Sequence, residues 1–304
     1  MVEATLDAEA LERLRNGALV HQMPAAVFSI AGPGALQCLQ GLLTNDVVKP
    51  ADGLLVYGAL LTPRGLIILD CWVIKLADRF LLITDLDART TAAELFKKQL
   101  PPRLAQVTDL TDEWHVYRLF GAGAVVPRID LDGVAVAESP LGRPFTALVA
   151  GTTDPVAHAL KLLAIAGART ATDDEWEAAR ILAGWARRGA EIDEKTLVQE
   201  VRFDENAGVS YEKGCYTGQE TVARLHFRGH TNRDLRGLTW SAAEPLTGGT
   251  IMVGEKEVGS VRSILSLPAG RIGLALIRRE VETGQVVTAG GVPATVVALP
   301  FPKD

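Results

Sequence analysis

The sequence predicts an α+β fold, with a mixed body over residues 1–234 and a β-rich C-terminal domain over residues 235–304. In the body, apolar residues at helical spacing alternate with short apolar runs that are typical of strands. From Leu235 onward the helical periodicity disappears, and short β-type runs alternate with glycine turns. Several short strands at this spacing favour a small antiparallel barrel. We expect the body to contain two interleaved subdomains.

Turn residues divide the first part of the body into alternating elements. Pro63-Arg64-Gly65 predicts a turn between two strands. Pro101-Pro102 must end a helix, since proline lacks the N–H group that a helix needs. The expected elements are, in order, helix Ala8–Gly17, strand Ala25–Ile30, helix Ala35–Leu43, strands Val56–Leu61, Leu66–Lys75 and Phe80–Thr84, and helix Asp85–Leu100.

A capping-box pattern marks the start of one helix in the middle of the chain. Thr172 is followed three residues later by Glu175, so each side chain can bond the backbone N–H of the other. This helix is expected to run to about Ala183. The other expected elements are strands Trp114–Leu119 and Ala147–Ala150, helix Asp154–Ala166 and, in the C-terminal domain, strands Leu235–Trp240, Thr250–Val253, Glu257–Ile264, Ile272–Ile277, Gln285–Thr288 and Ala294–Leu299.

The composition excludes several classes of protein. The formal net charge of −6 argues against direct DNA binding over a broad basic surface. No stretch approaches the roughly 18 apolar residues of a transmembrane helix, and residues 1–12 are too acidic for a secretory or transit peptide. Three cysteines without a CxxC spacing make neither a disulfide framework nor a cysteine-rich metal site. We therefore expect a cytoplasmic protein with no membrane contact and no metal site.

The segment from Lys213 to Glu220, KGCYTGQE, carries the strongest functional signal. Thr217 and Glu220 fit a second capping box, which predicts that a helix begins after Thr217. Cys215 would then lie just before the positive end of a helix dipole. Five basic and two acidic residues lie between residues 213 and 236, a local charge of +3. Both features favour thiolate over thiol, so we predict that Cys215 is a reactive thiol beside a positive pocket.

Other chemical signals are weaker. Cys38 and Cys71 have apolar neighbours and are expected to be buried. His226 could serve as a base for Cys215, but no orienting carboxylate is evident, which disfavours acyl transfer. Glu191 lies in a turn region where a carboxylate can face a pocket, so it is a candidate ligand contact.

At the cysteine segment the chain resembles the YgfZ family, which is related to the glycine-cleavage T-protein, an aminomethyltransferase. Residues 213–220 match the family signature, and Val222-Ala223-Arg224 and Arg228-Gly229 extend it. Further matching segments are Gln40–Asp46, Leu61–Pro63 with Gly65, Ala183–Gly184, Glu194–Leu197 and Gln199–Glu200. The resemblance therefore spans nearly the whole chain.

The resemblance implies a ring-like arrangement of three domains around a folate-binding hole, ending in a small β-barrel. It implies a tetrahydrofolate-binding protein that supports iron–sulfur cluster assembly or repair, including that of tRNA-modifying iron–sulfur enzymes. Its partners would be folate and iron–sulfur proteins or assembly factors, and we expect a monomer. T-proteins contact folate through an aspartate in a strand comparable to that of Asp70. The candidate site residues are Cys215 as the reactive thiol and, for the cofactor, Lys213, Tyr216, Gln219, Glu220, Arg224, Glu191 and Asp70.

Two alternatives stay open. One is a folate-dependent aminomethyltransferase or another one-carbon transferase, for which Asp70 is the main argument. The other is a folate-free scaffold that docks partner proteins and has no need of a ligand pocket.

Overall fold

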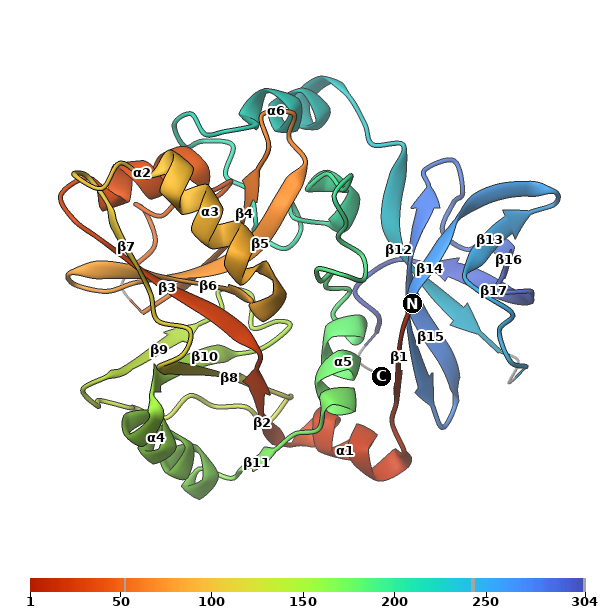
Figure 1. Ribbon diagram of the computed structural model, residues 1–304. Coiled ribbons are helices and arrows are strands. Elements are labelled where there is room, and N and C mark those ends of the chain that lie inside the picture. Colours follow the sequence, from red (N-terminus) through yellow and green to blue (C-terminus); the bar gives the residue numbers. More distant parts are fainter. Residues whose placement is uncertain (52, 242–243, 303–304) are drawn as a thin grey trace.

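The computed structural model describes residues 1–51, 53–241 and 244–302. Residues 52, 242, 243, 303 and 304, which the predicted domains include, lie outside the described residues. Three sheets lie around helix α5 (Asp173–Leu182) and the loop that follows it (Figure 1). Two sheets belong to the body and the third forms the C-terminal barrel. The predicted α+β fold with a terminal barrel is thus confirmed.

The first sheet has five antiparallel strands, and two helices cover its outer face. Its elements are β3 (Ala25–Ala31), β4 (Leu55–Leu61), β5 (Ile67–Lys75), β6 (Arg79–Asp85) and β7 (Gln106–Asp109), in the order β4-β5-β6-β3-β7, with α2 (Ala35–Leu42) and α3 (Arg89–Gln99). Along β5, Leu69 and Val73 pack under the helices, whereas Trp72 and Ile74 face the centre of the molecule. By the same alternation Asp70 stands on the central face.

The second sheet carries one helix on its outer face. Its elements are β2 (Ala18–Met23), β8 (Trp114–Phe120), β9 (Val134–Glu138), β10 (Ala147–Thr152) and β11 (Ala168–Thr170), in the order β11-β2-β8-β10-β9, with α4 (Thr153–Ile165). Along β8, Val116 and Phe120 join the central core, whereas Leu119 packs toward α4. Arg118 therefore lies on the apolar, central face of this strand.

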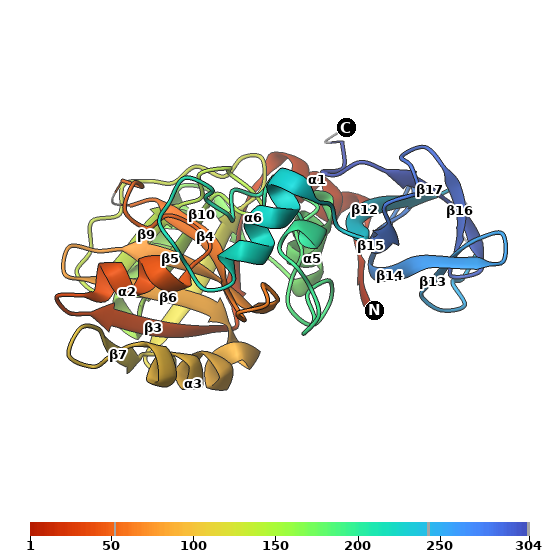
Figure 2. The same cartoon turned by 90° about the horizontal axis from the view of Figure 1, so that it is seen from above.

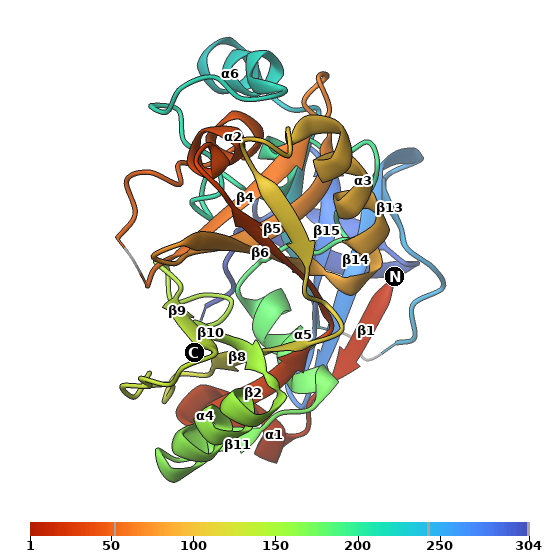
Figure 3. The same ribbon diagram turned by 60° about the vertical axis from the view of Figure 1, so that its left-hand side comes forward.

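The third sheet is a closed six-stranded antiparallel barrel. Its strands are β12 (Arg233–Trp240), β13 (Thr250–Val253), β14 (Lys256–Leu267), β15 (Gly270–Arg278), β16 (Val286–Ala289) and β17 (Val292–Val297), and the pairing of β14 with β15 closes it. Strand β1 (Val2–Thr5) runs parallel to β14, with Val2 opposite Ser263 (Figure 3). The start of the chain is thereby attached to the barrel.

Two further helices lie between the sheets. Helix α1 (Ala8–Asn16) follows β1 and packs against α5. Helix α6 (Gln219–Arg228) passes above α5, between the first sheet and the barrel (Figure 2). None of the helices in the described part of the chain is both long and apolar enough to cross a membrane.

The helices and the longer strands lie where the sequence predicts them. The largest boundary error is at the start of α3: Asp85 is the last residue of β6, and a 3-10 turn (Leu86–Ala88) separates it from α3. The five strands that the sequence analysis missed are all short: β1, β2, β7, β9 and β11. Most of them pair with strands distant in sequence, which local periodicity does not reveal.

The start of α6 differs from the prediction, and the capping role assigned to Thr217 was wrong. The N-cap is Gly218, in the left-handed region at φ 84°, and no side chain caps the helix. A Cβ at this position would lie 2.7 Å from the carbonyl oxygen of Thr62, so the close approach of the two segments requires glycine. At α5, by contrast, Thr172 and Glu175 make both bonds of the capping box.

This difference gives a testable prediction about stability. Thr172→Ala should lower the free energy of unfolding by about 1 kcal/mol, because it removes the cap of α5. Thr217→Ala is the matched control, with an expected change within about 0.5 kcal/mol, because it removes no cap. Urea unfolding followed by circular dichroism measures both. Equal losses from the two variants would contradict the assignment.

Candidate functional site

A small cavity of about 50 Å³ lies where the two body sheets meet α5 and the loop after it. Its polar lining includes two carboxylates and three guanidinium groups, and its walls are largely aromatic. The lining residues are Met23, Asp70, Trp72, Thr84, Asp85, Arg118, Pro144, Phe145, Trp176, Arg180, Trp185, Ala186 and Arg187. Such a mixture of flat apolar walls and a few polar groups is typical of a binding site for a small molecule.

Two aspartates face this cavity from neighbouring strands. The register of β5 and β6, in which Trp72 pairs with Ile83, places Asp70 and Asp85 at the same end of the two strands. The hydroxyl of Tyr57 donates to Oδ2 of Asp70 at 3.1 Å. Burial, together with the nearby charge of Asp85, raises the pKa of Asp70 to about 7. Asp70 is therefore suited to take up or release a proton at neutral pH.

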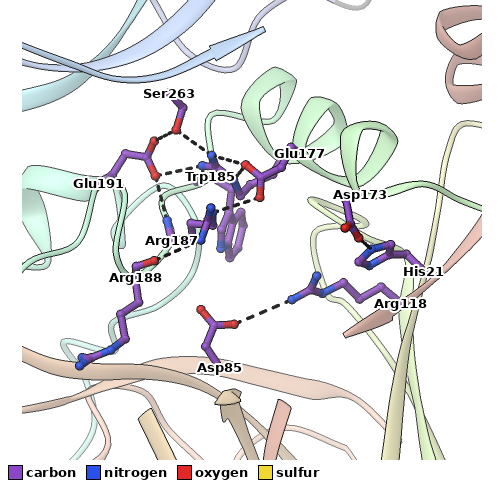
Figure 4. A network of polar contacts seen from close by, with 11 residues as sticks. His21, Asp85, Arg118, Asp173, Glu177, Trp185, Arg187, Arg188, Glu191 and Ser263 are labelled. Atoms are coloured by element: carbon purple, nitrogen blue, oxygen red, sulfur yellow. Dashed lines mark hydrogen bonds and ion pairs between the residues drawn. The ribbon is translucent and has the colours of Figure 1, made fainter. Parts of the chain in front are cut away.

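A buried ion network lies behind the cavity (Figure 4). Arg180 on α5 is 1% exposed and uses all five of its N–H groups. It donates to Oε2 of Glu177, Oε2 of Glu191, Oγ of Ser263 and the carbonyl of Trp185. Ser263 in turn donates to Glu191. The sequence-predicted Glu191 thus belongs to this network, one step behind the cavity wall.

The cysteine segment lies elsewhere, at the tip of the first sheet. Cys215 is exposed and Tyr216 is buried. The backbone of the segment is bonded to helix α2: the N–H of Thr217 donates to the carbonyl of Gly41 at 3.1 Å. A Cβ at Gly65, in the turn between β4 and β5, would lie 2.8 Å from Thr221, so this turn touches the start of α6.

Lys213 is buried and its ammonium group is fully occupied. It donates to the carbonyls of Gln40, Leu43 and Asn45 at 2.6–2.8 Å, and so binds the C-terminal end of α2 and the residues after it. Burial lowers the pKa of Lys213 to about 8. Its contacts hold the cysteine segment against the first sheet, and the side chain turns inward rather than toward solvent.

The other predicted residues of the segment are more accessible. Glu220 and Arg224 are exposed on α6 and make no ion pair with any residue the structure describes. Gln219 is half-buried, and its Oε1 lies 3.4 Å from the backbone N–H of Tyr216. His226, considered above as a base for Cys215, stacks instead on Tyr211 with ring centroids 3.7 Å apart.

The predicted site residues therefore fall into two groups. Asp70 and Glu191 belong to the central cavity and its support, and the other six belong to the cysteine segment and α6. Asp70 lies five residues along β5 from Gly65, which corresponds to roughly 16 Å at about 3.3 Å per residue. Cys215 and Asp70 thus lie at separate positions in the molecule.

Of the residues that line the cavity, the sequence analysis singled out Asp70 alone, and the polar residues it missed include Asp85 and Arg118. Asp85 was assigned to a helix start, and Arg118 was hidden in an apolar strand. A signal was present for Arg118, because strict alternation along Trp114–Phe120 places it on the same face as the buried Trp114 and Val116. A charged residue on the buried face of a strand marks a special environment.

Comparisons with known proteins agree with this architecture. A family model described as the GCVT N-terminal domain matches residues 2–127, and one described as the CAF17 C-terminal beta-barrel domain matches residues 235–301. The tRNA-modifying protein YgfZ of Enterobacter sp. (strain 638) is 26% identical over 302 residues, covering 91% of this chain and 90% of that protein.

Two more relatives differ in how much they share with this chain. The mitochondrial iron-sulfur cluster assembly factor IBA57 homolog of Mycosarcoma maydis is 25% identical over 235 residues, 71% of this chain but only 56% of that longer protein. The crystal structure of the glycine cleavage system aminomethyltransferase T from Bartonella henselae superposes with a TM-score of 0.83 at 20% identity, covering 97% of this chain and 89% of the other. This last likeness shows a shared fold.

Two predicted site cations, Lys213 in the cysteine segment and Arg224 on α6, should behave differently when removed. Lys213→Met should lower the free energy of unfolding by about 1–3 kcal/mol, because it leaves buried carbonyls without a donor. Arg224→Met should change it by less than about 0.5 kcal/mol, since this side chain is exposed. Urea unfolding of both variants measures the difference. A Lys213→Met variant as stable as the wild type would show that its carbonyl contacts contribute little.

The three cysteines should also differ in reactivity. Under native conditions Cys215 should be alkylated by iodoacetamide about tenfold or more faster than Cys71, with half-buried Cys38 in between. Cys71 is 1% exposed, and burial raises the pKa of its thiol well above its usual value. Mass spectrometry of the labelled peptides measures the rates, and labelling in urea is the control. Equal native rates would contradict a distinct role for Cys215.

Proposed function

We propose that this chain, which belongs to the YgfZ/CAF17 family of T-protein relatives, is a tetrahydrofolate-binding protein that supports the assembly or repair of iron–sulfur clusters. The clusters would include those of tRNA-modifying enzymes, in keeping with the names of the YgfZ and IBA57 relatives. The observation that carries the proposal is the pairing of a polar, aromatic-walled central cavity with an exposed cysteine on a separate, accessible segment.

The cavity residues are chemically suited to bind a pterin ring. Trp72, Trp176 and Trp185 offer flat apolar walls, and the carboxylates of Asp70 and Asp85 can accept from ring N–H groups. At about 50 Å³ the cavity is much smaller than the roughly 300–1,000 Å³ of typical ligand pockets. Folate binding therefore requires side chains at the cavity to move, and the ring would enter before the rest of the molecule.

The predicted site residues take different parts in this proposal. Asp70 would contact the folate ring, and Glu191 would hold in place the guanidinium group of Arg180 and the backbone N–H of Arg187 behind it. On the separate segment, Cys215 would act as the reactive thiol toward iron–sulfur proteins or assembly factors. Gln219, Glu220 and Arg224 would surround it as a contact surface, while Lys213 and Tyr216 hold the segment in position. Three unpaired cysteines suit a reducing compartment such as the cytoplasm, where we propose that the protein acts as a monomer.

One specific observation keeps an enzymatic alternative in view. A carboxyl group with a pKa of about 7 in a ligand cavity is a good general acid or base for aminomethyl or other one-carbon transfer. Purified protein given a lipoyl carrier loaded with an aminomethyl group, together with tetrahydrofolate, would then release ammonia and the reduced dihydrolipoyl carrier and form methylene-tetrahydrofolate. A folate-free scaffold is the other alternative, and it would show no heat of binding when titrated with tetrahydrofolate.

The test of the proposed function is complementation of cells that lack the protein. Cys215→Ala should fail to restore the activity of iron–sulfur enzymes, because the exposed thiol is lost. Cys38→Ala is the matched control and should restore activity, since that cysteine packs against the core under α2. Calorimetry with tetrahydrofolate completes the test. Full complementation by Cys215→Ala would remove the thiol role, and absence of tetrahydrofolate binding would remove the folate role.

A further inference from the structure

The three arginines of the central cavity differ in how well their donors are satisfied. Arg180 uses every N–H group in hydrogen bonds to its neighbours. Arg187 is partly exposed; its Nε lies 3.0 Å from Oε1 of Glu177 as an ion pair but makes no hydrogen bond. Arg118 makes no hydrogen bond to any residue the structure describes, although it is only 7% exposed. Of the three, Arg118 is thus the buried one with donors left over.

The groups around Arg118 hold its side chain in position but leave its N–H donors without hydrogen bonds. Its guanidinium carbon lies 3.9 Å above the centre of the Trp176 ring. Its nearest carboxylate oxygen, Oδ1 of Asp85, is 3.9 Å from Nη2, which is too far for a hydrogen bond. Its Nε has no partner and is shielded from solvent. Figure 4 shows the side chains of Arg118, from β8, and Asp85, from β6, pointing toward each other.

This arrangement is characteristic of a ligand-binding site. More than nine in ten buried polar groups in proteins have a hydrogen-bond partner, so a buried guanidinium without one calls for an explanation. Both Arg118 and Asp85 line the cavity, and so does Trp176 beneath the guanidinium. A guanidinium donor thus lies over the ring of Trp176, with a carboxylate acceptor 3.9 Å from it.

A donor next to an acceptor is complementary to one particular chemical group. A lactam edge, –NH–C(=O)–, offers its N–H to a carboxylate and its carbonyl oxygen to a guanidinium. We infer that Arg118 is a ligand-binding residue of the cavity and that, together with Asp85, it binds the lactam edge of a flat heterocycle. With the folate-binding function proposed above, on which this inference rests, the edge is that of the pterin ring.

Two other roles of Arg118 would give different results when its side chain is removed. If its guanidinium served only to fill space over Trp176, removal would enlarge the cavity and strengthen ligand binding. If it served only to support the fold, removal would weaken the binding of every ligand equally. A lactam contact instead predicts that the loss depends on the carbonyl oxygen of the ligand.

The experiment compares two ligands that differ at this edge. Tetrahydrofolate has the lactam, whereas its 4-amino analogue has an amino group in place of the carbonyl oxygen. Calorimetry with the full-length protein should show that Arg118→Met weakens tetrahydrofolate binding by about tenfold or more and changes binding of the 4-amino analogue much less. The wild type should prefer tetrahydrofolate.

Arg79→Met is the matched control. Arg79 also lies over a tryptophan, 6.0 Å from the centre of Trp114, and its Nε also lacks a partner, but it does not line the cavity. This variant should bind tetrahydrofolate within about twofold of the wild type. Should Arg118→Met fail to fold, as judged by circular dichroism, Asp85→Asn and the ligand preference of the wild type test the same edge.

The outcomes are distinct. Unchanged or tighter tetrahydrofolate binding by Arg118→Met, an equal loss for both ligands, or a wild type without preference between them would each overturn the inference while leaving folate binding intact. Failure of the wild type to bind tetrahydrofolate would instead remove the proposed function, and the inference with it.

Discussion

The arrangement of the three sheets depends on the buried charge network around Arg180. From α5 this one guanidinium holds the following loop through Glu191 and the carbonyl of Trp185, and the barrel through Ser263 of β14. A buried ion network is stabilising only when every donor and acceptor has a partner, because an uncompensated charge is costly in the protein interior. The network therefore fixes the position of the barrel relative to the body. Trp185, whose carbonyl accepts from Arg180, also lines the cavity.

The sequence could predict the parts of this structure that local physics decides. Periodicity and turn residues placed the main helices and the barrel strands, and Thr172 caps its helix as its spacing indicates. The same Thr-x-x-Glu spacing failed at Thr217, because the carbonyl of Thr62, far away in sequence, requires glycine at position 218. Strand β1 was missed for a similar reason, since its partner β14 lies some 260 residues further along the chain. Contacts between distant segments decide these features.

The candidate site shows the same division between local and distant information. The cysteine segment could be recognised as a continuous motif, and Cys215 is indeed exposed. The cavity could be recognised only in part, because Asp70, Asp85 and Arg118 come from three strands of two sheets and meet only in the folded chain. The two places are joined by the turn between β4 and β5, which touches α6 at Gly65, and by β5 itself, which carries Asp70.

In this protein, the cations with a structural role differ from the proposed binding cation in how many of their N–H donors make hydrogen bonds. Lys213 lies in the functional motif, yet three carbonyls occupy its ammonium group, which makes it part of the scaffold. Arg180 lines the cavity but has no donor left for a ligand. Arg118 lies outside every sequence motif, and it alone among the buried cations of the cavity keeps its donors unused. Since desolvation of an unpaired donor is unfavourable, such a group persists where a partner outside the chain can satisfy it.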